Sequence, residues 1–151
     1  MPTFEVQVEI EQPPDVVEQA FLDPENAVFW TTDLKQFEVV SRKPGEVGSV
    51  AHLHFVQGSR RYIMKDELLE FIPRQYFKSR VSGNGINALV ETRLQDLGES
   101  TKVEVKWSGT VESIRLRIML FLMRRVMVRQ TQSELEQFKS LVELHGAHFA
   151  Q

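Results

Sequence analysis

Residues 86–109, INALVETRLQDLGESTKVEVKWSG, contain two alternating runs on either side of a turn at Gly98. Alternation with a period of two is typical of β-strands, and a glycine turn between two such runs predicts a β-hairpin. One register gives mutually consistent pairs on its inner face: Leu94–Val103, Thr92–Val105 and Val90–Trp107. On the outer face this register pairs opposite charges, Arg93–Glu104 and Glu91–Lys106. A slip by one residue would reverse both faces, so the register predicts which residues line the inside of the sheet.

Strands and short helices account for the rest of the first 112 residues. Residues 4–10 alternate between apolar and polar side chains, which predicts a first strand. A Pro-Pro-Asp sequence then opens a short helix that runs through Phe21, and a second short helix follows over residues 24–31. A second strand includes residues 37–39, and turn signals divide residues 48–112 into a run of antiparallel strands.

Residues 113–146 lack proline and contain a single glycine, Gly146, so they predict one long helix. Ser113 is suited to cap its N-terminus and Gly146 to end it. One stripe of this helix is apolar and includes Leu120, Met123 and Met127. The whole chain, residues 1–151, is therefore expected to form one α+β domain: a strand, two short helices, six strands and a long C-terminal helix.

Two further hairpins extend the inner face of the sheet. Around Gly58 the predicted pairs are Phe55–Tyr62, Leu53–Met64 and Ala51–Asp66. Around Gly83 they are Val81–Ile86, Ser79–Ala88 and Phe77–Val90. This face holds small residues, which leave volume beneath the helix, and the carboxylate of Asp66, which must be paired or have a raised pKa. A mostly apolar hollow with a few polar groups is typical of a small-molecule site.

We therefore expect a ligand cavity between the sheet and the long helix. Its predicted sheet lining is Leu53, Phe55, Tyr62, Met64, Asp66, Phe77, Ser79, Ala88, Val90, Thr92, Val105, Trp107 and Gly109. Its predicted helix lining is Leu120, Met123 and Met127.

Composition excludes several classes of protein. The 151 residues carry a formal net charge of −3 and no long basic run, which argues against a nucleic-acid partner. The chain has no cysteine, so disulfides and thiolate chemistry are excluded, and a cytoplasmic location is expected. The longest apolar run near the C-terminal helix, residues 118–123, is far shorter than the ~20 residues that span a bilayer, so no transmembrane segment is expected.

Four segments resemble the START-like, or SRPBCC, superfamily, which includes polyketide cyclase/dehydrase-like proteins and has the helix-grip fold of the birch-pollen allergen. They are VEIEQPPDVVEQAFLDPENAVFW (8–30), PGEVGSVAHLHF (44–55), ELLEFIPRQYF (67–77) and LFLMRRVMVRQTQSELEQFKSLVE (120–143). The resemblance implies a deep cavity between a curved seven-stranded antiparallel sheet and the C-terminal helix wrapped by it. Members bind lipids, steroids, quinones, polyketides or plant hormones, and some are aromatase/cyclases. The resemblance implies no universal catalytic residues and no cofactor.

Three functional hypotheses follow. The first is binding or transport of a hydrophobic small molecule, with Asp66 and Tyr62 fixing its orientation. The second is a cyclase, dehydratase or isomerase that uses Asp66 and Tyr62 as catalytic groups. The third is an interaction module in which Ile118, Phe121 and Leu122 dock on a partner or a membrane surface. Under each hypothesis the protein is expected to be a monomer or a homodimer.

Two pairs of histidines invite a metal-site interpretation. His52 and His54 are two residues apart on a strand, but the register places them on the outer face without a third ligand nearby in sequence, so no metal is expected there. His145 and His148 lie near the chain end and are expected to be solvated.

Overall fold

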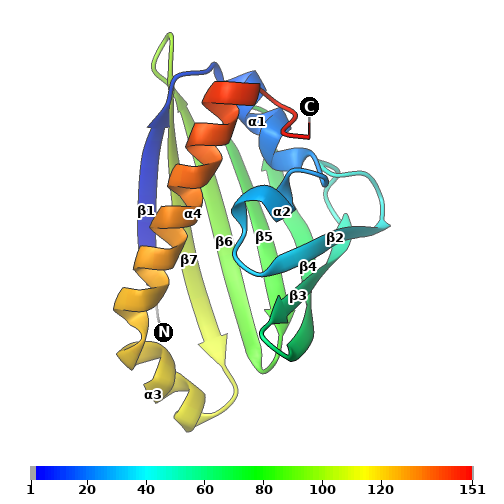
Figure 1. Cartoon of the computed structure of the whole chain (residues 1–151), viewed down its shortest axis with the longest axis vertical. Coiled ribbons are helices and arrows are strands. Elements are labelled where there is room, and N and C mark those ends of the chain that lie inside the picture. The colour runs from blue at the N-terminus through cyan, green and yellow to red at the C-terminus, as the bar shows by residue number, and fades with distance from the viewer. Residues whose placement is uncertain (1–2, 151) are drawn as a thin grey trace.

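A curved antiparallel sheet of seven strands forms one layer of the structure, in the order β1-β7-β6-β5-β4-β3-β2 (Figure 1). This computed structural model describes residues 3–150. The strands are β1 (Thr3–Ile10), β2 (Leu34–Ser41), β3 (Val50–Gln57), β4 (Arg60–Ile72), β5 (Tyr76–Gly83), β6 (Ile86–Asp96) and β7 (Thr101–Val111). The helices are α1 (Pro14–Leu22), α2 (Ala27–Trp30), α3 (Ile114–Leu122) and α4 (Arg124–His145). The predicted helix-grip architecture is confirmed.

Helix α4 covers the sheet unevenly. It runs along β1 and β7, with α1 and α2 beside it (Figure 1). The main core lies under this half of the sheet and includes six fully buried or nearly buried residues from these elements: Ile10, Val17, Val103, Leu135, Phe138 and Val142. A second, smaller core of Leu34, Leu53 and Met64 lies at the other end of the sheet. The space between the two cores is where a cavity can form.

The predicted registers of two hairpins are confirmed, and the third is wrong by two residues. Strands β6 and β7 pair Leu94 with Val103, and β3 and β4 pair Phe55 with Tyr62, as expected. Strands β5 and β6 instead pair Gly83 with Ile86, Val81 with Ala88, Ser79 with Val90 and Phe77 with Thr92. The reason is a tight two-residue turn at Asn84-Gly85, whose φ angles of 52° and 76° suit these residue types. An even shift leaves every side chain on its predicted face.

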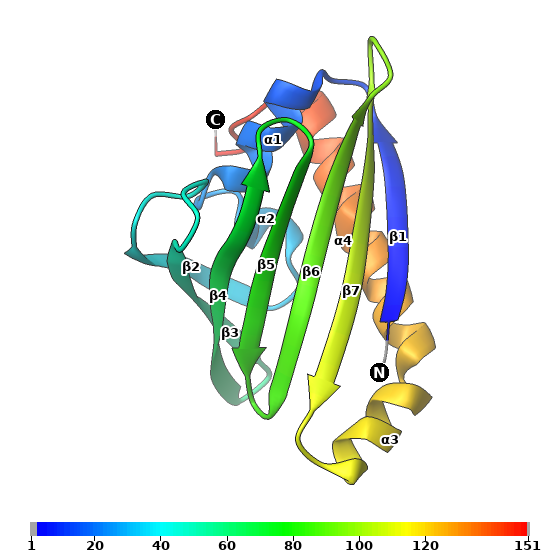
Figure 2. The same ribbon diagram turned by 180° about the vertical axis from the view of Figure 1, so that it is seen from behind.

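The single long C-terminal helix is also corrected, because the chain breaks at Met123. Ser113 caps the first part, since its hydroxyl accepts a hydrogen bond from the Leu116 backbone N–H at 3.1 Å. Met123 has φ −92° and ψ 5°, and α4 starts at the next residue in a new direction (Figures 1 and 2). No proline or glycine marks this break, so side-chain packing of α3 against the end of the sheet decides it.

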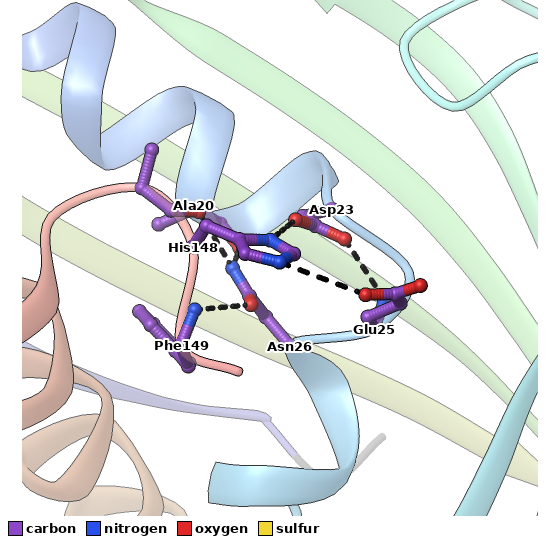
Figure 3. A network of polar contacts seen from close by, with 7 residues as sticks. Ala20, Asp23, Glu25, Asn26, His148 and Phe149 are labelled. Atoms are coloured by element: carbon purple, nitrogen blue, oxygen red, sulfur yellow. Dashed lines mark hydrogen bonds and ion pairs between the residues drawn. The ribbon is translucent and has the colours of Figure 1, made fainter. Parts of the chain in front are cut away.

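A buried amide joins the C-terminal segment to the loop between α1 and α2 (Figure 3). The Asn26 side chain is fully buried; its Nδ2 donates to the carbonyls of Ala20 at 3.0 Å and Ala147 at 2.8 Å. Its Oδ1 accepts from the Phe149 backbone N–H at 2.9 Å. This network holds the aromatic ring of Phe149 against the core.

The sequence suggested that His148 is solvated near the helix end, but the structure places it in a hydrogen bond with Asp23. Its Nδ1 lies 2.5 Å from Oδ2 of Asp23, and this hydrogen bond raises the pKa of His148. Glu25 lies 3.7 Å from the other ring nitrogen. The interaction was not predictable from sequence because 125 positions separate His148 from Asp23.

Replacing Asn26 with alanine should destabilise the protein by about 2–4 kcal/mol, because one carbonyl and one N–H from the C-terminal segment and one carbonyl of α1 lose their partner. Urea unfolding followed by circular dichroism measures this change. Asn87→Ala is the matched control, since Asn87 is exposed on β6, and its effect should stay within about 0.5 kcal/mol. Equal stability of the two variants would contradict the role assigned to Asn26.

Candidate functional site

A cavity of about 340 Å³ lies between the sheet, α2 and α4. A volume near 300 Å³ is at the lower end of the range for small-molecule sites. The wall is mostly apolar, with a few hydroxyl and carboxyl groups. Its lining residues are Phe21, Ala27, Trp30, Thr31, Leu34, Phe37, Leu53, Asp66, Phe77, Ser79, Val81, Val90, Thr92, Val105, Trp107, Thr131, Glu134 and Leu135.

Eight of the thirteen sheet residues predicted to line the cavity are found in its wall. Leu53, Asp66, Phe77, Ser79, Val90, Thr92, Val105 and Trp107 all line the cavity. Phe55, Tyr62, Met64, Ala88 and Gly109 lie elsewhere on the same face. Phe55 stacks on Tyr62 with a centroid distance of 5.1 Å, and both pack with Met64 in the second core. They fill the far end of the sheet because β2 curls over them.

Gly109 leaves no open volume, because Trp107 occupies the space above it. A Cβ atom at Gly109 would lie 2.2 Å from the Trp107 indole. The indole also stacks on Phe4 with a centroid distance of 5.4 Å and a 16° interplanar angle. Ala88, which pairs with Gly109 and is 2% exposed, is likewise packed rather than open to the cavity. Gly109 therefore accommodates an aromatic side chain, and this holds Trp107 as a fixed part of the wall.

The helix residues that line the cavity differ from those predicted. Met123 is 43% exposed at the helix break, and Leu120 is buried on the inner side of α3. Met127 packs against the main core. Helix α4 contributes Thr131, Glu134 and Leu135 instead. The break at Met123 explains this for Leu120 and Met123, because residues before it follow a different axis from α4. Met127 lies on α4 itself and faces the main core instead.

Asp66 lies where the cavity meets a second, smaller pocket of about 110 Å³. Phe21, Phe37, Phe77 and Ser79 also border both spaces. Burial raises the pKa of Asp66 from 3.8 to about 6, and the Ser79 hydroxyl partly opposes this rise. A carboxyl group with this pKa donates a hydrogen bond when protonated and accepts hydrogen bonds when ionised near neutral pH.

Glu134 is a second carboxylate on the wall, contributed by α4. Burial raises its pKa, and its hydrogen bond from the Thr32 backbone N–H, at 2.7 Å, acts in the opposite direction. This bond also ties α4 to the loop after α2. Glu134 shares one face of α4 with Thr131 and Leu135, and this spacing was a usable signal in the sequence. It was not recognised, because two polar residues, Thr131 and Glu134, interrupt the apolar stripe of the helix.

The cavity roof was the other part of the wall absent from the predicted lining. Ala27, Trp30, Thr31, Leu34 and Phe37 come from α2, the following loop and β2. This stretch has no regular period that would assign its faces. Trp30 reaches both the wall and the core, where it meets Phe138 edge-on at a centroid distance of 5.0 Å.

The outer surface brings together two groups of potential metal ligands. His54 Nε2 lies 2.8 Å from Glu38 Oε1, and His52 Nδ1 lies 4.0 Å from it. Asp23, Glu25 and His148 have ligand atoms within 4.8 Å of one another. In both groups, hydrogen bonds and ion pairs between the side chains account for the arrangement.

Comparison with known proteins places this geometry in a family. The family model "Polyketide cyclase / dehydrase and lipid transport" matches residues 1–143. The chain belongs to this family. None of the curated proteins matches the sequence significantly.

Solved structures share the family fold at low sequence identity. A conserved protein from Geobacillus kaustophilus is 15% identical with a TM-score of 0.79, covering 96% of this chain and 97% of that one. The Zhui aromatase/cyclase from Streptomyces sp. R1128 is 16% identical with a TM-score of 0.74, covering 92% of each chain. Ara h 8.0201 is 13% identical with a TM-score of 0.73, covering 93% of this chain and 97% of that one. At these identities the likeness concerns the fold alone.

The raised pKa of Asp66 predicts a pH-dependent stability difference. Because the folded state binds its proton more tightly than the unfolded chain, this group's contribution to stability is full below pH 3.8 and is lost as pH rises through about 6. Asp66→Asn should therefore be about 1–3 kcal/mol more stable than the wild type at pH 8, and nearly equal to it at pH 4. Urea unfolding at both pH values measures the difference. A variant that is no more stable at pH 8 would show that Asp66 is well solvated.

Proposed function

We propose that this protein binds a hydrophobic small molecule that carries one polar group. The observation that supports this most directly is the apolar cavity of about 340 Å³ with Asp66 at its junction with a second pocket. Burying the apolar surface of a ligand here would contribute roughly 25 cal/mol per Å². The family description, polyketide cyclase / dehydrase and lipid transport, supports ligands of the lipid or polyketide class.

Asp66 and Ser79 give the cavity a polar end. Below about pH 6 the protonated Asp66 donates a hydrogen bond, which suits a ligand carbonyl. Above this pH the carboxylate favours a ligand hydroxyl. The ligand class proposed is therefore an apolar skeleton with a carbonyl or hydroxyl at one end. Native mass spectrometry of gently purified protein would show whether such a molecule copurifies.

Filling the cavity should abolish binding without changing the fold. Val90→Phe places a phenyl ring in the wall, whereas Leu89→Phe introduces the same ring at the neighbouring residue, on the opposite face of β6. Nile red, a neutral dye that fluoresces in apolar surroundings, reports occupancy in a titration. Val90→Phe should weaken its binding at least tenfold, and Leu89→Phe should leave it within about twofold. Equal affinities would mean that the dye binds elsewhere.

A cyclase or dehydratase activity is the second candidate, because two carboxyl groups with raised pKa face one cavity. Such groups are typical of general acid–base sites. If the protein turns over a poly-β-ketone thioester, Asp66→Asn should lower kcat by about a hundredfold or more while dye affinity changes little. Tyr62→Phe is the control, since Tyr62 packs on Phe55 outside the wall. Full activity of Asp66→Asn would eliminate the catalytic assignment.

A further inference from the structure

Helix α3 exposes an apolar face to solvent. Ile114, Ile118, Phe121 and Leu122 have 70%, 55%, 75% and 73% of their surface exposed. With about 100° of rotation per residue, these four side chains fall on one side of the helix. We call them the α3 face. An isolated exposed leucine is ordinary, but four large side chains on one helical face form a patch that calls for an explanation.

The other side of α3 already packs on the protein. Leu120 is 6% exposed, and Leu116 lies over Gly85 in the turn between β5 and β6. A helix with apolar residues on two sides is normally covered on both of them. Here the helix extends beyond the end of β7, away from the C-terminus, and no helix or strand within residues 3–150 covers its outer side (Figures 1 and 2).

Positive charge borders the α3 face on both sides. Arg115 and Arg117 are exposed and flank the four apolar residues on the helical wheel. Residues 113–133 contain five arginines and no carboxylate, although the whole chain has a net charge of −3. Within residues 3–150, none of these arginines has a carboxylate within 4.0 Å. Their charge is therefore not neutralised by close ion pairs within this part of the chain.

We propose that the α3 face docks on an anionic lipid bilayer. An exposed helix with bulky apolar residues on one side and arginines at its margins is suited to the interface, where the side chains enter the headgroup region and the guanidinium groups meet lipid phosphates. No helix within residues 3–150 is long and apolar enough to cross a bilayer. The proposal concerns the outer surface and does not depend on what the cavity binds.

The charges favour a lipid surface over a second copy of the chain. In a two-fold contact between α3 faces, Arg115 and Arg117 of one copy would approach the same residues of the other, and like charges oppose such a contact. Four side chains also offer much less than the about 800 Å² per partner of a standard protein interface.

Vesicle flotation tests this proposal with matched variants. The probes are vesicles of phosphatidylcholine with 30% phosphatidylglycerol and vesicles of phosphatidylcholine alone. Leu122→Ser removes an apolar side chain from the α3 face, and Leu144→Ser makes the same change at a leucine that is 77% exposed near the other end of α4. The pair Arg115→Gln/Arg117→Gln is compared with Arg74→Gln/Arg80→Gln, which removes the same charge from exposed sites on and beside the sheet.

Wild type and both control variants should float with the anionic vesicles and much less with the neutral ones. Leu122→Ser and Arg115→Gln/Arg117→Gln should each weaken binding by about tenfold or more. Failure of the wild type to bind anionic vesicles, or equal loss in the controls, would overturn the proposal. It would also be overturned if Leu122→Ser changed only the oligomeric state in sedimentation equilibrium, because a second copy would then occupy the α3 face.

Discussion

The packing of Phe138 on Phe21 fixes where α4 lies, and the rest of the molecule depends on that position. The two rings are 4.0 Å apart and nearly parallel, and Phe138 is fully buried. This contact holds α4 over β1 and β7 rather than over the middle of the sheet. Strands β3 to β6 then need another cover, which α2 and β2 supply without filling the space beneath them. The cavity is thus a consequence of one helix packing on one half of a curved sheet.

Burial in this cavity alters the chemistry of its polar groups. Asp66 comes from the sheet and Glu134 from α4, and burial raises the pKa of both carboxyl groups. Ionised carboxylates in such surroundings lower stability, so their presence on the wall is better explained by recognition or catalysis than by folding. The two residues also differ in restraint: the Glu134 carboxylate accepts a hydrogen bond from the Thr32 backbone N–H, whereas within residues 3–150 Asp66 has the Ser79 hydroxyl as its polar partner. Asp66 is therefore the group freer to engage a ligand.

Local rules predicted the sheet well because its faces are set by period and charge. The register of β6 and β7 followed from the pairs Arg93–Glu104 and Glu91–Lys106, which are both observed. The β5–β6 register failed because loop length was misjudged, yet the faces survived the even shift. The cavity wall was predicted only in part, since sequence assigns a residue to a face but not to a neighbour. Whether Gly109 opens a hollow or accommodates an indole depends on the rotamer of Trp107, and whether Met123 faces inward depends on a helix break without a sequence signal.

The helix break at Met123 also explains why the two sides of α3 have different surroundings. Had α4 continued through residues 114–123, its axis would have carried these side chains beyond the end of the sheet, with no part of the fold beneath them. Turning at Met123 lets Leu116 and Leu120 pack against the end of the sheet, which accounts for the inner side of α3. It does not account for the outer side, because polar residues at Ile114, Ile118, Phe121 and Leu122 would preserve the same packing and improve solubility. Apolar residues there, between arginines that form no ion pair within residues 3–150, are explained by a surface outside the fold that is itself apolar within and anionic at its margin.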